Sequence, residues 1–197
     1  LIFWVGLALR LGKMMRENPS IREGLELPKH EDELVSIVIP AHNEERVINK
    51  CVLSIRNQSH KKLQIIFVLD RCTDQTKEIL QTHADEDGRI TIIENESCPD
   101  HWAGKCNAAK VGSQLVEGTW LLFTDADTSF DPELVRCAIA SAKKRGASLL
   151  SLLSSLTTLN HFEKIAQPVA STFLVRQYPV DKINREVDSR PFANGQF

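Results

Sequence analysis

Two aspartates separated by one alanine, Asp125 and Asp127, stand close behind the apolar run Trp120–Phe123. Carboxylates at positions i and i+2 repel each other unless a positive group lies between them. A hard divalent cation, Mg²⁺ or Mn²⁺, prefers oxygen ligands and shares its remaining positions with water and substrate phosphates. The pair therefore indicates a metal site that serves a phosphorylated ligand. Taken alone, the pair is better explained as a solvated turn or a helix cap, and the metal site is favoured only by its context.

Polar residues follow two other apolar runs in the same way. The stretch "PAHNEE", residues 40–45, comes after the first run, and we expect Ala41 and Glu44 to line a nucleotide pocket. Asp70 ends the second run, where its carboxylate could accept a hydrogen bond from the imide N–H of uracil. The alternative for both stretches is local capping of the helices that follow.

A glycine and a lysine, Gly104 and Lys105, mark the start of a predicted helix in "HWAGKCNAA". Glycine allows a ligand to approach the backbone closely, and a lysine at a helix start can meet a diphosphate together with the helix N–H groups. A plain turn with a solvated lysine is the alternative for this dipeptide alone.

Short apolar runs alternate along the chain with segments of helical periodicity, which predicts an α/β domain with a mainly parallel sheet. The carboxyl ends of the strands in such a sheet meet at one edge, where ligands bind. The acids described above would therefore lie together. The predicted strands are 34–40, 63–70, 90–94 and 119–125, and the predicted helices are 45–58, 73–85, 105–117 and 131–146; a fifth apolar run covers 147–155.

Composition excludes several classes of protein. The chain has 197 residues and a formal net charge of −2, without a basic stripe, which argues against nucleic acid as a partner. Its five cysteines include no C-x-x-C spacing, so neither a disulfide framework nor a zinc site is indicated and a reducing compartment fits best.

The two ends predict a fragment of a longer protein, because the chain begins at Leu1 and ends in "FANGQF". Residues 1–17 could be the end of a membrane helix, with an amphipathic helix as the alternative, and 18–33 are expected to be a linker. The domain would then cover 34–197, associated with a membrane and facing the cytoplasm.

Four stretches together, "VSIVIPAHNEE", "IIFVLDRCTD", "WAGKCNAA" and "LLFTDADTSFDPELV", resemble the nucleotide-sugar glycosyltransferases of family 2, which have the Rossmann-like GT-A fold with helices on both faces of the sheet. The resemblance implies that Ala41, Glu44 and Asp70 contact the nucleoside and that Lys105 lies near the diphosphate. It implies that Asp127 is the more direct metal ligand, that Asp125 also lies close to the ribose or sugar, and that Gly195 lies near the sugar and acceptor.

This sequence departs from the family pattern at Leu69, where a second acid is common, and at Lys110, where asparagine is common. The base that activates the acceptor is expected beyond Phe197. The later part of the chain looks most like membrane-associated members of hopanoid and carotenoid pathways. The apolar helical pattern at 160–178 would be either a core helix or a helix at the membrane surface that receives a lipid acceptor.

The predicted function is transfer of a sugar, hexosyl-like, from a nucleotide-diphosphate sugar to a lipid or glycan acceptor, by a metal-assisted displacement that inverts the anomeric centre. A UDP-sugar is the favoured donor. One alternative is a nucleotidyltransferase, although "PAHNEERVINK" lacks the glycine-rich basic loop that such enzymes usually have. The other is a non-catalytic relative that binds nucleotide-sugars.

Overall fold

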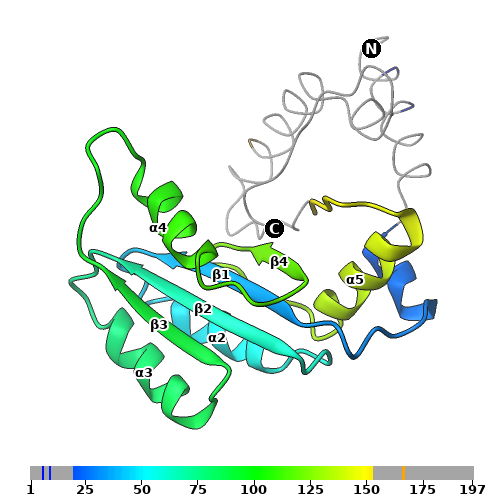
Figure 1. Ribbon diagram of the computed structural model, residues 1–197, viewed down its shortest axis with the longest axis horizontal. Helices are drawn as coiled ribbons and strands as arrows, with labels where there is room; N and C mark the ends of the chain where they lie inside the picture. The colour runs from blue at the N-terminus through cyan, green and yellow to red at the C-terminus, as the bar shows by residue number, and fades with distance from the viewer. Residues whose placement is uncertain (1–5, 7–8, 10–19, 153–165, 167–197) are drawn as a thin grey trace. The chain divides into compact units, whose positions relative to one another are not determined.

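The computed structural model describes residues 6, 9, 20–152 and 166. The elements named below belong to one compact unit that contains Ile21–Leu152. In this part of the chain, four parallel strands form a sheet in the order β3-β2-β1-β4, which confirms the predicted fold class (Figure 1). The strands are β1 (Val35–Ala41), β2 (Leu63–Asp70), β3 (Ile90–Asn95) and β4 (Trp120–Phe123).

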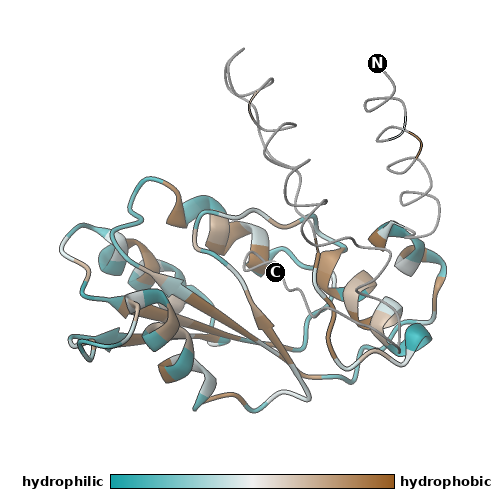
Figure 2. Ribbon diagram, turned by 90° about the horizontal axis from the view of Figure 1, so that it is seen from above, coloured by the Kyte–Doolittle hydropathy of each residue, from teal (hydrophilic) through white to brown (hydrophobic). Residues whose placement is uncertain are grey.

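Helices cover both faces of this sheet, because successive side chains of a strand point to opposite sides. On one face, β1 residues Val35, Ile37 and Ile39 share a core with helix α2 (Ile48–Arg56), helix α3 (Thr76–Glu86) and helix α5 (Leu134–Arg145). On the other face, Val38 packs with helix α4 (Gly104–Ser113). Figure 2 shows the apolar strands between the more polar helix surfaces.

The order of the strands places a switch of direction between β1 and β4. The chain moves outward from β1 through β2 to β3 and then returns by way of α4 to add β4 on the other side of β1. In open parallel sheets, ligands bind outside the carboxyl ends of the strands at such a point. The topology therefore selects the ends of β1 and β4 as the place for a site.

Helix α4 lies close to the sheet because Gly112 has no side chain. A Cβ atom at this position would lie 2.5 Å from Val38 Cγ1 and 2.9 Å from Val68 Cγ2. The helix can therefore rest directly on β1 and β2, which fixes the position of its first residues at the edge of the sheet.

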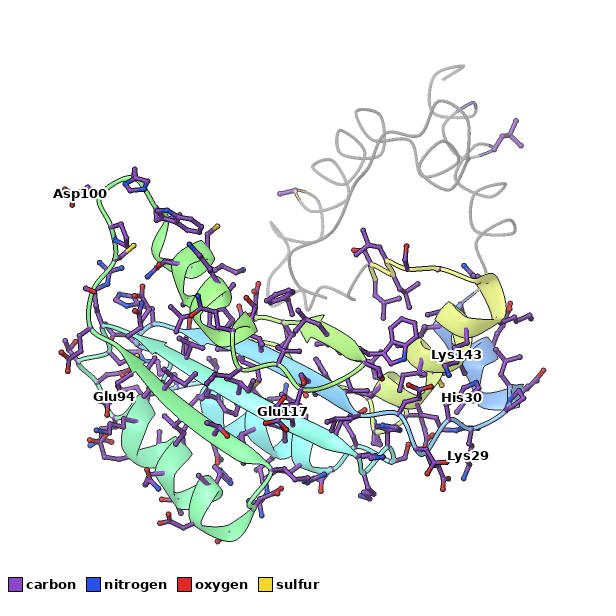
Figure 3. All side chains as sticks on the ribbon, in the orientation of Figure 1. Lys29, His30, Glu94, Asp100, Glu117 and Lys143 are labelled. Atoms are coloured by element: carbon purple, nitrogen blue, oxygen red, sulfur yellow. The ribbon has the colours of Figure 1, made fainter. Side chains whose placement is uncertain are left out.

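Part of the segment 18–33, expected to be a linker, forms the 3-10 helix η1 (Ile21–Glu26), which packs on α5. A Cβ at Gly24 would lie 2.6 Å from Cys137 Cα, and Arg136 Nη2 donates a hydrogen bond to Leu25 O at 3.0 Å. Lys143 of α5 pairs with Glu33 just before β1. Figure 3 shows Lys143 at the opposite end of the sheet from Glu94 of β3.

Several predicted boundaries differ from the structure. Helix α2 begins at Ile48 rather than Glu45, because the preceding residues bond to a neighbouring loop, and β4 ends at Phe123, before the acids. Residues 147–152 of the fifth apolar run have neither helix nor strand structure. Within the described part of the chain, no helix is long and apolar enough to cross a bilayer. Most of the segment 1–17, nearly all of 160–178, and Gly195 lie outside the described residues.

Candidate functional site

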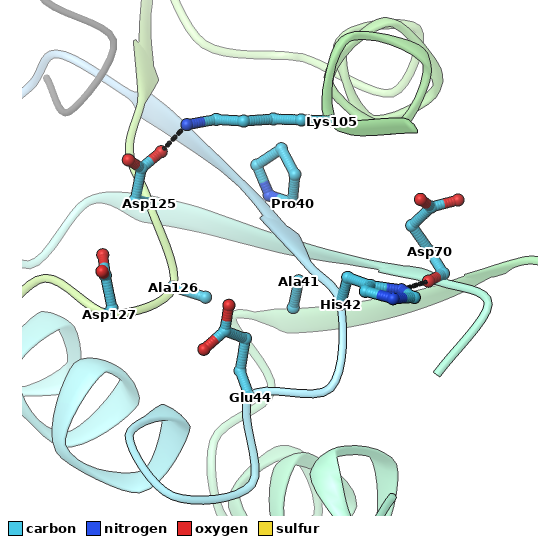
Figure 4. Close-up of a pocket in the computed structure, with 9 residues that line it drawn as sticks. All are labelled: Pro40, Ala41, His42, Glu44, Asp70, Lys105, Asp125, Ala126 and Asp127. Atoms are coloured by element: carbon cyan, nitrogen blue, oxygen red, sulfur yellow. Dashed lines mark hydrogen bonds and ion pairs between the residues drawn. The ribbon is translucent and has the colours of Figure 1, made fainter. Parts of the chain in front are cut away.

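The carboxyl ends of β1, β2 and β4 and the start of α4 enclose one pocket (Figure 4). It is lined by Pro40, Ala41, His42, Glu44, Asp70, Lys105, Asp125, Ala126 and Asp127. The structure thus brings together every predicted site residue that it describes, although their roles in binding stay predictions. Gly195 is the one predicted site residue outside the described range.

A buried alanine fixes the direction of the two aspartates. Ala126 is 3% exposed and belongs to the main hydrophobic core, so Asp125 and Asp127 on either side of it line the pocket. The turn is held by Thr128, whose Oγ1 donates to the Asp125 carbonyl at 2.8 Å. The same hydroxyl lies 2.9 Å from Thr124 Oγ1. Packing and hydrogen bonds therefore set the backbone of the acid pair before any ligand arrives.

Lys105 supplies the positive charge nearest to the acid pair. Its Nζ forms an ion pair with Asp125 Oδ1, a buried atom that lacks a hydrogen bond of good geometry (Figure 4). Among the residues that the structure describes, none makes a hydrogen bond or ion pair with the exposed Asp127 side chain. The lysine therefore compensates one carboxylate and leaves the other available to a ligand.

Glu44 adds a third carboxylate to the same pocket. Its backbone N–H donates to Thr76 Oγ1 at 2.8 Å, which fixes the residue at the start of the loop after β1. Burial raises the pKa of Glu44 above its ordinary value, and the negative charges of Asp127, Asp74 and Asp125 raise it further. The field in this part of the pocket is therefore negative, which favours a cation.

The carboxylates of the pocket suit a hard cation whose remaining ligand positions are filled by water and a bound phosphorylated ligand. Asp125, Asp127 and Glu44 offer only oxygen atoms, which is the ligand type of Mg²⁺ and Mn²⁺. Within residues 20–152, no group of three or more histidine, cysteine, aspartate or glutamate side chains is placed to hold a metal ion. A cation at the two aspartates would therefore need water and the phosphates of a ligand to complete its shell.

Asp70 sits deep at the other side of the pocket. Its backbone carbonyl lies 2.5 Å from His42 Nδ1, and its carboxylate is bonded by Arg71 and Asn95. The Arg71 hydrogen bonds hold the pKa of Asp70 below its ordinary value, so the carboxylate is ionised at neutral pH. Arg71, His42 and Asn95 are not among the predicted site residues, and in the sequence only their places beside predicted strand ends indicate them.

The loops after β1 and β2 bond to each other, in addition to the local bond from the Thr76 N–H to Asp74 Oδ1. Asn43, in the loop after β1, has φ +55° and accepts a hydrogen bond from the Thr73 N–H at 2.8 Å. Glu45 N–H donates to Asp74 Oδ2 at 3.0 Å, and Glu45 Oε2 accepts from the Gln75 N–H at 3.1 Å. These reciprocal bonds hold the two loops that carry Glu44 and Asp70 in one arrangement.

The family model "Glycosyl transferase family 2" matches residues 36–183, which is most of the chain. The chain belongs to this family. The matched range contains the strands except Val35, the first residue of β1, together with the helices that cover them and every described residue of the pocket. The resemblance inferred from the four motifs is thereby confirmed.

Curated proteins align with parts of the chain. Glycosyltransferase GlyA of Streptococcus pneumoniae is 31% identical over 104 residues, which cover 53% of this chain and 14% of GlyA. Chondroitin synthase of Escherichia coli is 27% identical over 150 residues, 76% of this chain and 21% of that protein. The chain thus spans a small part of the length of these relatives.

Solved structures support the GT-A fold. A crystal structure of Staphylococcus aureus TarS in complex with UDP-GlcNAc matches with a TM-score of 0.52 and 19% identity. The match covers 66% of this chain and 38% of that chain. At this identity the similarity concerns the arrangement of strands and helices alone.

Proposed function

We propose that this family 2 protein transfers a sugar from a UDP-sugar to an acceptor by a metal-assisted displacement that inverts the anomeric centre. One observation carries the proposal: Glu44, Asp70, Lys105, Asp125 and Asp127 come from separate elements and line one pocket at the carboxyl edge of the sheet. Membership of family 2 favours glycosyl transfer over the alternative of nucleotidyl transfer.

Each residue of the pocket has a proposed role. Asp127 and Asp125 would hold Mg²⁺ or Mn²⁺, with Asp127 the more direct ligand, and the bound cation would neutralise charge on the leaving diphosphate. Lys105 would assist at the diphosphate, and Asp125 would also lie near the ribose or sugar. Ala41, Glu44 and Asp70 would contact the nucleoside, and Gly195 would lie near the sugar and the acceptor.

The acceptor side of the reaction needs a general base that takes the proton of the attacking hydroxyl. We propose that a carboxylate beyond Phe197 fills this role. An acceptor of lipid type, with the domain cytoplasmic and associated with a membrane, is also proposed. One relative, WfaP of Escherichia coli, is 34% identical over 95 residues, and its name describes a glucosyltransferase acting on a diphosphoundecaprenol-linked sugar.

Calorimetric titration of the full chain with UDP, with Mn²⁺ and again with excess chelator, tests the proposal. We expect binding that weakens at least about 10-fold without the cation, because the two aspartates then face the diphosphate with uncompensated charge. Equal affinity in both titrations would remove the metal role. In a protein extended to include the proposed base beyond Phe197, turnover of a UDP-hexose with Mn²⁺ separates a transferase from a non-catalytic relative, which would bind the donor and leave it intact.

A further inference from the structure

Asp70 and Arg71, neighbours in the chain, form a two-point ion pair at the carboxyl end of β2. Arg71 Nε donates to Asp70 Oδ1 at 3.1 Å, and Arg71 Nη2 donates to Asp70 Oδ2 at 2.8 Å. Adjacent side chains of an extended strand point to opposite faces, so this contact requires a turn. Arg71 makes the turn with φ +51°, a left-handed conformation that costs a non-glycine residue about 1 kcal/mol or more.

The Asp70 carboxylate has one acceptor position left for a ligand. Its two oxygens offer about four positions in total. Oδ1 accepts from Arg71 and also from Asn95 Nδ2 at 3.1 Å, and Oδ2 accepts from Arg71. Asp70 is only 4% exposed yet lines the pocket, so a ligand group that meets the free position on Oδ2 must approach from the pocket side.

The guanidinium of Arg71 is the more accessible half of the pair. Its side chain is 48% exposed, and Nη1 has no hydrogen-bond partner within residues 20–152. Gly104 at the start of α4 leaves room for both groups, because a Cβ there would lie 2.4 Å from Asp70 Oδ2 and 2.7 Å from Arg71 Nη2. Asp70 therefore lines this end of the pocket as a deep acceptor, and the donor-only guanidinium of Arg71, which is not itself a lining residue, adjoins it through their ion pair.

We propose that Arg71 determines base specificity by reading, together with Asp70, an N–H group that stands beside a carbonyl oxygen on the nucleobase. Asp70 accepts from the ring N–H, and the Arg71 guanidinium donates to the neighbouring carbonyl. Uracil and guanine carry this edge. The inference rests on the proposed function, which anchors the diphosphate at Lys105 and the acid pair so that the base cannot slide along the pocket.

Cytosine and adenine present the same kinds of group in the reverse order. A ring nitrogen without hydrogen would face the Asp70 carboxylate, acceptor against acceptor, and an amino group would face Arg71, donor against donor. Leaving such groups unpaired in a site built to bond them costs affinity on the order of 10-fold or more. The geometry therefore selects UDP or GDP over CDP and ADP.

Calorimetry of the full chain with UDP, CDP, GDP and ADP in the presence of Mn²⁺ tests the inference. For the wild type we expect UDP to bind at least about 10-fold more tightly than CDP, or GDP to exceed ADP by that factor. Whichever of UDP and GDP binds more tightly identifies the base. In Arg71→Gln the ratio should fall by at least about threefold, because the amide of glutamine can either donate or accept, while Asp70 still favours a ring N–H.

Two further variants secure the comparison. Arg71→Gly tolerates the left-handed backbone, so it folds without the strain, and its ratio should also fall because no side-chain donor then meets the carbonyl of the base. Arg145→Gln removes the same charge at the end of α5, near the opposite end of the sheet, and should keep the wild-type ratio. An unchanged ratio in Arg71→Gln, or a wild type without preference, overturns the inference. A folded wild type that binds no nucleoside diphosphate instead overturns the proposed function.

Discussion

The two ends of the sheet use charge in opposite ways. At the amino end of β3, Asp87 is paired with Arg89, whose Nη2 lies 2.7 Å from Asp87 Oδ2, and with Arg56, whose Nε lies 3.5 Å from the same atom. The hydrogen bonds from Arg89 lower the pKa of Asp87 to about 2. At the carboxyl end, burial and neighbouring carboxylates raise the pKa of Glu44.

This difference separates charges that stabilise the fold from charges that a bound ligand would compensate. Asp87 finds its counter-ions inside the chain, so its charge favours folding. Glu44 and Asp127 share a pocket with other acids. Lys105 is the lysine that lines this pocket, and it is paired with Asp125. Groups with like charge in one pocket are typical of functional sites, where the compensating charge comes with the ligand.

Loss of Asp127 should have the largest effect on binding. In Asp127→Ala we expect the Mn²⁺-dependent affinity for UDP to fall by roughly 100-fold, since a direct ligand is removed. The melting temperature should not fall, because the exposed side chain supports no bond among the described residues. Asp85→Ala, an exposed acid on α3, is the matched control and should bind normally. Undiminished metal-dependent binding by a folded Asp127→Ala protein would show that Asp127 is not a metal ligand, and the contrast between the two ends of the sheet would then fail.

Loss of Asp87 should have the reverse pattern, a change in stability without a change in binding. A pKa lowered from 3.8 to about 2 corresponds to roughly 2 kcal/mol of unfolding free energy at neutral pH. Asp87→Asn should lose about this amount in urea denaturation at pH 7 and should keep the affinity for UDP. Full stability in the variant would show that the ion pairs of Asp87 with Arg56 and Arg89 do not stabilise the fold.

The same ion pairs predict a dependence on pH. Because the folded pKa of Asp87 lies below the unfolded one, its stabilisation is complete above about pH 3.8 and is lost as the pH falls towards 2. The difference in unfolding free energy between wild type and Asp87→Asn should therefore shrink over this interval. A difference that stays constant from pH 5 to pH 2.5 would assign the effect to packing instead of charge.

Glu44 should show a smaller effect of opposite sign. Its folded pKa is raised, so the fold penalises the ionised form and the unfolding free energy declines as the pH rises above 4.5. Without divalent cations, Glu44→Gln should be more stable than wild type at pH 7.5, by less than about 1 kcal/mol. The gain should vanish near pH 4. A variant that is less stable at pH 7.5 would contradict the negative field proposed for the pocket.

The sheet could be predicted from the sequence because its strands are short apolar runs bounded by polar residues. For β2 the predicted and observed bounds agree, Leu63 to Asp70. The meeting of Glu44, Asp70 and Asp125 in one pocket also followed, because parallel strands deliver their carboxyl ends to one edge. Local pattern and sheet geometry sufficed for these features.

The details within the pocket depend on contacts between distant segments, which no local pattern contains. Arg71 has a left-handed backbone and folds back on Asp70, although arginine carries no preference for that conformation. Asn43 bonds to Thr73 of another loop instead of capping its own helix. The ion pair of Lys105 with Asp125 likewise joins two elements that only the folded sheet brings together.

Uptake of Mn²⁺ tests the central account most directly. Electron paramagnetic resonance reports free Mn²⁺, so its signal can be followed as wild-type protein is added with and without UDP. We predict that the signal falls strongly only when protein and UDP are both present, because the two aspartates need the diphosphate to complete the shell. With Asp127→Ala protein and UDP, the free Mn²⁺ signal should equal that of a sample with UDP and no protein. The same equality with wild-type protein and UDP would contradict the account.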